Sequence, residues 1–233
     1  MRVKFRSLMV VSFLSIFLSQ NITAQEVEAD PWEGFNRAVF SFNETLDAYA
    51  LKPLTRGYKA VMPDVIEQGV SNFFDNLADV GTMVNNLLQG KVDNAVEDLG
   101  RVAFNSTFGL VGFIDVATPM GIEKHNEDFG QTLGYWGVDS GPYLVLPFFG
   151  PTTVRDGVGK VPDTFLDPVH YVEDNGAQNA LYITRAIDTR GSLLESEKLI
   201  SGDRYSFIRD AYLQKREFDI VDGNIEDYDD SNF

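Results

Sequence analysis

Apolar residues recur every three or four positions along much of the chain, which is the spacing of amphipathic helices. The first repeat is rich in aromatic side chains and consists of Trp32, Phe35, Val39, Phe42, Leu46 and Tyr49. Asp30, Pro31 and Glu33 precede its main part as a cap, a first-turn proline and a capping-box acid. We therefore expect a helix that begins near residue 30 and ends before Pro53.

Two interpretations of this aromatic face are open. Packing in a protein core is the more ordinary role for such a face. The alternative is contact with lipid or with another membrane protein. The polar opposite face, which includes Asn36, Asn43, Glu44 and Asp47, adds weight to that alternative.

Further apolar repeats predict helices over 63–77, 91–108, 177–190, 192–199 and 205–218, and a turn-rich segment over 80–90. Strand-like alternation of apolar and polar residues is nearly absent. The expected fold class is therefore all-α, and a chain of 233 residues suits one domain.

Residues 127–163 are dense in glycine and proline, and we expect them to form an ordered, irregular, partly apolar loop. Gly137 and Gly141 flank Asp139 and Ser140, and Pro142 follows at once. Glycine permits backbone angles closed to other residues, and proline fixes the chain on one side. The arrangement suits a short hairpin across 137–142, which is either a static turn or a gate that moves on a rigid base.

Charge and cysteine content limit the partners and the kinds of site that this protein can have. The chain carries 35 acidic and 19 basic residues, so nucleic acid and anionic lipid headgroups should repel it. Any hold on a membrane must then come from apolar surface. Cysteine is absent, which excludes disulfides, thiolate metal sites and thioether lipid anchors.

We do not expect the two ends of the chain to belong to the folded domain. Residues 1–24 combine a basic start, an apolar run and Ala24 at a plausible cleavage site, which is the pattern of a signal peptide. An uncleaved interfacial anchor is the alternative. We expect the folded domain over 25–218 and a solvated, disordered acidic tail over 219–233.

No residues show a recognisable catalytic spacing. His125 and His170 lie outside any metal or catalytic motif, and we interpret His125 as a solvated loop residue. We interpret Arg155 and Asp156 as a local ion pair rather than acid–base machinery. The expectation is a binding or transport protein that is not an enzyme and uses no cofactor or metal.

Three segments carry a resemblance to a known family: DPWEGFNRAVFSFN from residue 30, EDFGQTLGYWGV from residue 127 and GPYLVLPFFGPTTVRD from residue 141. In this order they resemble the signature blocks of the MlaA (VacJ) family, over about residues 30–218. The resemblance implies a ring of amphipathic helices with a short hairpin, in the periplasmic leaflet of the outer membrane of a Gram-negative bacterium. Many members are lipoproteins acylated on a cysteine that this sequence lacks.

The resemblance also implies intermembrane phospholipid transport. Mislocalised phospholipid would leave the outer leaflet through an amphipathic channel and pass to a periplasmic lipid carrier protein, which maintains lipid asymmetry. Trimeric outer-membrane porins are the implied membrane partners. The residues expected at the channel or its gate are Phe42, Asn43, Gly137, Gly141, Pro142, Tyr143, Arg155, Asp156 and Asp167. Two rival classes are a porin-associated scaffold that moves no lipid and a lipid hydrolase, which the missing nucleophile motif disfavours.

Overall fold

A computed structural model describes residues 30–224, so the predicted signal peptide and residues 225–233 of the predicted tail lie outside the described part. The compact helical unit begins at Trp32. Its α-helices are α2 (Glu33–Leu46), α3 (Lys52–Val61), α4 (Asp64–Leu88), α5 (Val92–Phe108), α6 (Phe129–Tyr135), α7 (Val154–Leu166), α8 (Asn175–Ser192) and α9 (Arg204–Ile220). Strands β1 (Tyr143–Leu146) and β2 (Gly150–Thr153) form the single sheet of the described residues, and the all-α prediction is confirmed.

Helical structure at the N-terminal end runs further than predicted. Trp32, not Asp30, occupies the cap position of α2, and no side chain caps the helix there. A π-helical turn, Asp47–Leu51, joins α2 to α3, and Pro53 lies in the first turn of α3 instead of ending the helix. The wider turn places the proline where its missing N–H is tolerated.

α4 is one unbroken helix of 25 residues, where a shorter helix and a turn-rich segment were predicted. It packs along α5, and the seam between them is polar. Arg101 of α5, for example, donates a hydrogen bond from Nε to the buried Asp79 of α4 at 3.2 Å. In the apolar repeat of α5, Val96 and Leu99 are exposed, and the small Ala95 is buried. The repeat correctly predicted a two-faced helix, but the buried face is the polar one.

The glycine- and proline-rich stretch is not an irregular loop as predicted. It forms α6, the β1–β2 hairpin and α7, and α7 contains Gly157, Gly159 and Pro162. A Cβ on Gly159 would lie 2.6 Å from the backbone nitrogen of Gly130 in α6. The glycines that suggested a loop therefore allow two helices to approach closely.

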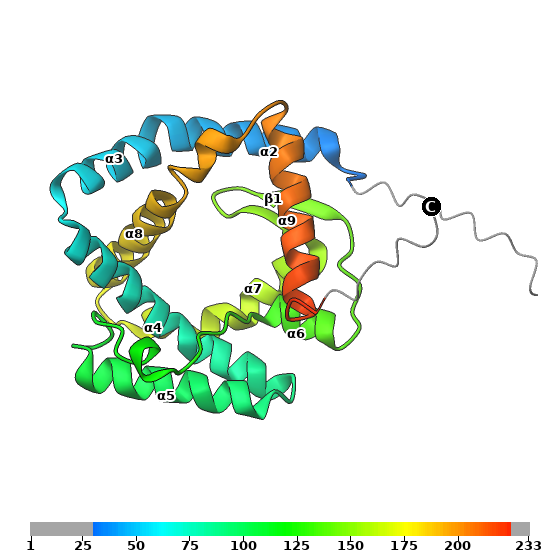
Figure 1. Ribbon diagram of the computed structural model, residues 1–233. Coiled ribbons are helices and arrows are strands. Elements are labelled where there is room, and N and C mark those ends of the chain that lie inside the picture. Colours follow the sequence, from blue (N-terminus) through cyan, green and yellow to red (C-terminus); the bar gives the residue numbers. More distant parts are fainter. Residues whose placement is uncertain (1–29, 225–233) are drawn as a thin grey trace, which may run out of the picture. The chain divides into compact units, whose positions relative to one another are not determined.

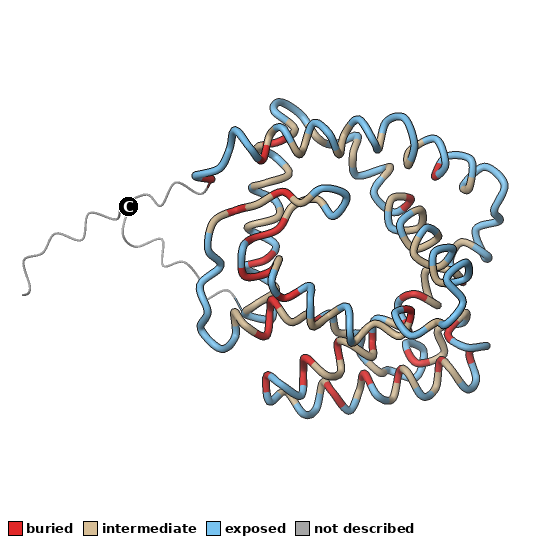
Figure 2. Tube along the Cα trace, turned by 180° about the vertical axis from the view of Figure 1, so that it is seen from behind, coloured by how far each residue is buried: buried red, intermediate tan, exposed pale blue. Residues whose placement is uncertain are grey.

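Contacts between neighbouring elements close this unit into a ring, which Figures 1 and 2 show from opposite sides. α2 packs on β1, β2 on α9, α9 on α6, and α6 on α7 and α4. α4 contacts α8, and α8 contacts α3, which continues from α2. The predicted ring of amphipathic helices is confirmed for the unit that begins at Trp32. α9 extends to Ile220, so the first two residues of the predicted tail are helical.

The distribution of buried residues is inverted relative to an ordinary water-soluble domain, which buries apolar side chains and exposes charged ones. Among residues 30–224, seven apolar residues and twenty polar ones are buried, while thirty-six large apolar residues are exposed. Figure 2 shows the buried positions scattered along the helices in short patches. On α2, Phe35 is 57% exposed and Asn36 is fully buried, so core packing is the wrong interpretation for most of the aromatic face, although Val39 does pack against buried residues.

Candidate functional site

The β1–β2 hairpin brings together residues from distant parts of the chain. Its strands pair antiparallel along their whole length and leave residues 147–149 as the tip. Phe148 adopts a left-handed backbone conformation with φ of 68°. Phe148 and Phe149 are 71% and 73% exposed, so the tip presents two aromatic rings.

Two asparagines of α2 hold the outer edge of β1. Asn36 accepts a hydrogen bond from the N–H of Val145 at 2.9 Å and donates to the carbonyl two residues earlier at 3.0 Å. Asn43 accepts from the N–H of Phe148 at 2.9 Å and donates to the carbonyl of Leu146 at 3.0 Å. Seven helical residues rise about 10.5 Å and three strand residues about 10 Å, so the two amides match the strand. Each amide therefore forms hydrogen bonds with this edge that a neighbouring strand would otherwise form.

Aromatic contacts reinforce both ends of the hairpin. The rings of Phe42 and Phe148 meet edge to face with centroids 5.5 Å apart. At the base, the ring of Tyr143 meets those of Tyr205 and Tyr212 on α9 at 6.2 and 6.3 Å. Aromatic pairs contribute about 0.5–1.5 kcal/mol beyond their burial. α2 therefore holds the tip, and α9 holds the base.

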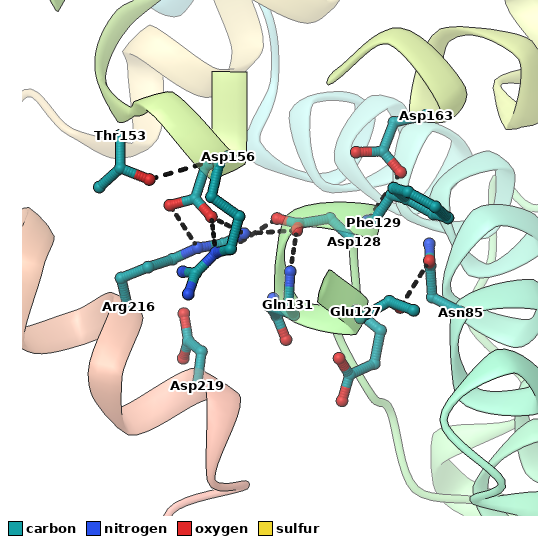
Figure 3. A network of polar contacts seen from close by, with 12 residues as sticks. Asn85, Glu127, Asp128, Phe129, Gln131, Thr153, Asp156, Asp163, Arg216 and Asp219 are labelled. Atoms are coloured by element: carbon teal, nitrogen blue, oxygen red, sulfur yellow. Dashed lines mark hydrogen bonds and ion pairs between the residues drawn. The ribbon is translucent and has the colours of Figure 1, made fainter. Parts of the chain in front are cut away.

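A buried ion-pair network lies beneath the base (Figure 3). Thr153 ends β2 and caps α7 by accepting a hydrogen bond from the N–H of Asp156 at 3.2 Å. The carboxylate of Asp156 accepts from the hydroxyl of Tyr212 at 2.8 Å and lies 2.9 Å from Nε of Arg216. Arg216 also donates to Asp128, the N-cap of α6. One guanidinium thus ties α9 to the first turns of α6 and α7.

The pair of Asp156 and Arg216 is held in its ionised form. Burial opposes ionisation of Asp156, but the hydrogen bond and charge of Arg216 outweigh it, so the pKa of Asp156 lies below its usual range. Nearby Asp163 accepts the backbone N–H of Phe129 at 3.0 Å, and burial raises its pKa to about 6. The base is therefore a fixed charged support with a more readily protonated carboxyl beside it.

The predicted loop residues lie on the approach to β1. Gly137 and Gly141 have positive φ angles of 86° and 65°, as expected of turn glycines. The predicted hairpin across 137–142 is wrong in position, because β1 begins only after Pro142. Sequence rules point to glycine for left-handed angles, whereas Phe148 adopts one at the real tip.

The predicted charged residues do not form one accessible path. Arg155 donates to Asp156 from Nε at 3.0 Å and to the carbonyl of Val138 from Nη1 at 3.2 Å, and its side chain is 5% exposed. Arg155 and Asp156 therefore support the hairpin from within the protein. Asp167 lies apart, at the end of α7, and pairs with Arg185 of α8 at 2.7 Å.

Sequence reasoning missed several residues that hold the hairpin. Asn36 was assigned only to a polar face, and Phe148 and Arg216 received no role. The available signal was the seven-residue spacing of Asn36 and Asn43, which places both amides on one side of a helix.

Known proteins are similar to this chain in sequence and in architecture. The family model described as "MlaA lipoprotein" matches residues 28–219. The chain belongs to the MlaA family. The intermembrane phospholipid transport system lipoprotein MlaA of Escherichia coli (strain K12) is 33% identical over 238 residues, which cover 100% of this chain and 94% of that protein. The protein of the same name from Haemophilus influenzae is 33% identical over 214 residues, covering 89% and 86%.

A solved structure with the MlaA fold also matches. It is described as "Structural basis for maintenance of bacterial outer membrane lipid asymmetry" and is 36% identical, with a TM-score of 0.72. The match covers 82% of this chain and 98% of that one. The MlaA relatives are named lipoproteins, whereas these 233 residues contain no cysteine. Within the described residues, no helix combines the length and apolar character needed to cross a membrane.

Proposed function

We propose that this protein transports phospholipid between membranes. It would take mislocalised phospholipid from the outer leaflet of the outer membrane and pass it to a periplasmic lipid carrier protein. The observation that carries the proposal is the inverted burial, with polar side chains inside and apolar side chains outside. The E. coli relative, whose name specifies intermembrane phospholipid transport, supports it.

The two faces of α5 favour lipid over water as the surroundings. Val96 and Leu99 are 61% and 54% exposed, and an apolar stripe of this kind is unfavourable in water. Polar groups of a protein in lipid must find partners internally, and Asp98 and Arg101 do so across the seam with α4. We infer that exposed apolar surface holds the protein in the outer membrane without an acylated cysteine.

A second apolar stripe runs along α7, next to the hairpin base. Val158, Val161 and Phe165 are 61%, 60% and 58% exposed and share one side of the helix by their spacing. The side of α7 that holds Gly159 packs on α6. We propose that this stripe accommodates the acyl tails of the transported lipid, because tails need a continuous apolar surface.

The hairpin is the proposed moving part. Its tip depends on the Asn43 amide and the Phe42–Phe148 contact, and Gly137 and Gly141 can act as hinges on the approach. The other residues expected at the channel would support it from the base or brace α7: Pro142, Tyr143, Arg155, Asp156 and Asp167.

Two partners belong to this proposal. A trimeric outer-membrane porin would cover part of the exposed apolar face, and a periplasmic carrier would receive the phospholipid. The net charge of −16 favours membrane contact through apolar side chains over attraction to anionic headgroups.

The test uses a Gram-negative strain that lacks its own MlaA-family gene. Surface-exposed phospholipid is measured with and without expression of this protein, and fractionation checks that the protein reaches the outer membrane. We expect expression to lower surface phospholipid to the level of the parent strain. If the protein reaches the outer membrane and binds porin while surface phospholipid stays high, a porin-associated scaffold replaces transport as the function.

A further inference from the structure

We propose that Glu97, Glu123 and His125 form a binding site for zinc or a similar divalent transition-metal ion. One ligand atom from each lies within 4.8 Å of the others, and Nε2 of His125 is 3.7 Å from Oε2 of Glu97. Glu97 belongs to α5, while Glu123 and His125 lie in the segment that connects α5 to α6. The His125 side chain is 18% exposed, so the interpretation of a solvated loop histidine is wrong.

A buried carboxylate orients the imidazole. Nδ1 of His125 lies 3.0 Å from Oδ1 of Asp98, and Asp98 is fully buried. A proton on Nδ1 is donated to Asp98, which leaves the lone pair of Nε2 for a metal ion beside Glu97. Histidine ligands commonly donate their other N–H to a carboxylate in this way.

The local charge balance also points to a cation. Within residues 30–224, His125 is the single ion-pair partner of Asp98, whose other side-chain contact is the neutral amide of Asn86 at 2.8 Å. A buried carboxylate requires compensating positive charge, and a metal ion on Nε2 supplies it through the imidazole. The two glutamates add negative charge, and the neighbouring Lys124 pairs with Asp75 instead.

The ligand types select the class of metal. One imidazole with two carboxylates suits zinc and its first-row neighbours, whereas magnesium and calcium favour sites made entirely of oxygen ligands. Tetrahedral zinc with bonds of about 2.0–2.1 Å sets its ligands about 3.3 Å apart. Rotation of the two partly exposed glutamate side chains can close the present spacing to that value. The ion would fasten the segment before α6 to α5.

The histidine content of the chain allows a matched experiment, because His125 and His170 are its two histidines and cysteine is absent. The protein is purified without a histidine tag, stripped with a chelator and titrated with zinc chloride by calorimetry. Wild type and His170→Gln should bind one equivalent, and His125→Gln should bind at least about tenfold more weakly. Equal affinities of the two variants, or no binding by wild type, would overturn the proposal.

A second pair of variants tests the site in case His125→Gln fails to fold. Glu123 and Glu173 are both exposed, so neither substitution should disturb the fold. Zinc should raise the thermal unfolding temperature of wild type and Glu173→Gln, and should raise that of Glu123→Gln much less. Equal zinc-induced shifts in all three proteins would overturn the proposal, as would equal shifts with calcium.

Discussion

The side-chain amide of Asn43 forms two hydrogen bonds with the hairpin tip, accepting from the N–H of Phe148 at 2.9 Å and donating to the carbonyl of Leu146 at 3.0 Å. Asn36 makes the equivalent pair of bonds two helical turns earlier. Each amide satisfies both a donor and an acceptor on a strand edge that lacks a neighbouring strand there. The position of the hairpin therefore depends on α2, which is distant from it in sequence.

Asn43→Ala should loosen the hairpin tip. The substitution leaves a backbone donor and acceptor without their partner, at a cost of about 1–2 kcal/mol. We expect hydrogen exchange at the Phe148 amide to accelerate by about 5–30-fold. Asn179→Ala, at an exposed position of α8, is the matched control and should leave this amide unchanged. Unchanged exchange at Phe148 in Asn43→Ala would contradict the role given to Asn43.

Deletion of Phe42 or of Asn43 should uncouple α2 from the hairpin. Losing one residue rotates the remainder of the helix by about 100°. The residues after the deletion then no longer face the same side of the helix as Asn36. We predict lost control of lipid flow and not mere loss of function. Surface phospholipid should then exceed that of a strain with no protein. If a deletion variant folds and behaves like wild type, α2 has only a packing role.

Gly159→Ala should destabilise the contact between α6 and α7. The new Cβ would lie 2.6 Å from the backbone nitrogen of Gly130 and force the helices apart, at a cost of about 1–3 kcal/mol. Gly157→Ala is the control in the same helix, because the atom nearest to its new Cβ would be a methyl of Thr152, 3.7 Å away. Chemical denaturation should show Gly159→Ala to be clearly less stable than Gly157→Ala. Equal stabilities would show that the close approach is not needed.

Asp163→Asn should change how stability depends on pH. Burial raises the pKa of Asp163 from 3.8 to about 6 in the folded protein, so its stabilising contribution is full below about pH 4 and is lost as pH rises through 6. Asparagine keeps an acceptor for the N–H of Phe129 and carries no charge. The variant should be more stable than wild type near pH 7.5, by on the order of 1 kcal/mol because solvent screens the partly exposed group, and equal to it only at a pH below the unfolded pKa of 3.8. Parallel pH profiles in thermal unfolding would contradict this.

The periodicity of the sequence predicted the helices better than it predicted their environment. On α5, the repeat that includes Val96 and Leu99 identified two faces, but the exposed face is the apolar one. A helical period shows that a helix has two faces and does not show which solvent surrounds it. The buried partners of Asp98 and Arg101 lie on another helix, and a single repeat carries no information about them.

Only part of the site was predicted, because the sequence alone does not show which distant segments come together. Phe42 and Asn43 were assigned to the channel or its gate through the family resemblance, and the structure places both against the hairpin tip. The hairpin itself was expected too early because glycine density marked 137–142, while the tip uses Phe148. Arg216 approaches Asp128 only through the tertiary fold, across 88 residues of sequence.

The central claim is that the hairpin gates phospholipid transport, and the most direct test fixes the hairpin to α2. Phe42 and Phe148 are 49% and 71% exposed in a chain without cysteine, so Phe42→Cys with Phe148→Cys can be joined by a short, reducible bifunctional thiol reagent. Surface phospholipid is measured in cells before cross-linking, after it and after reduction, with each single-cysteine variant as a control. The account predicts that the cross-link raises surface phospholipid to the level of a strain without the protein and that reduction restores its removal. Normal removal with the cross-link fully formed would contradict the gate and leave a static turn.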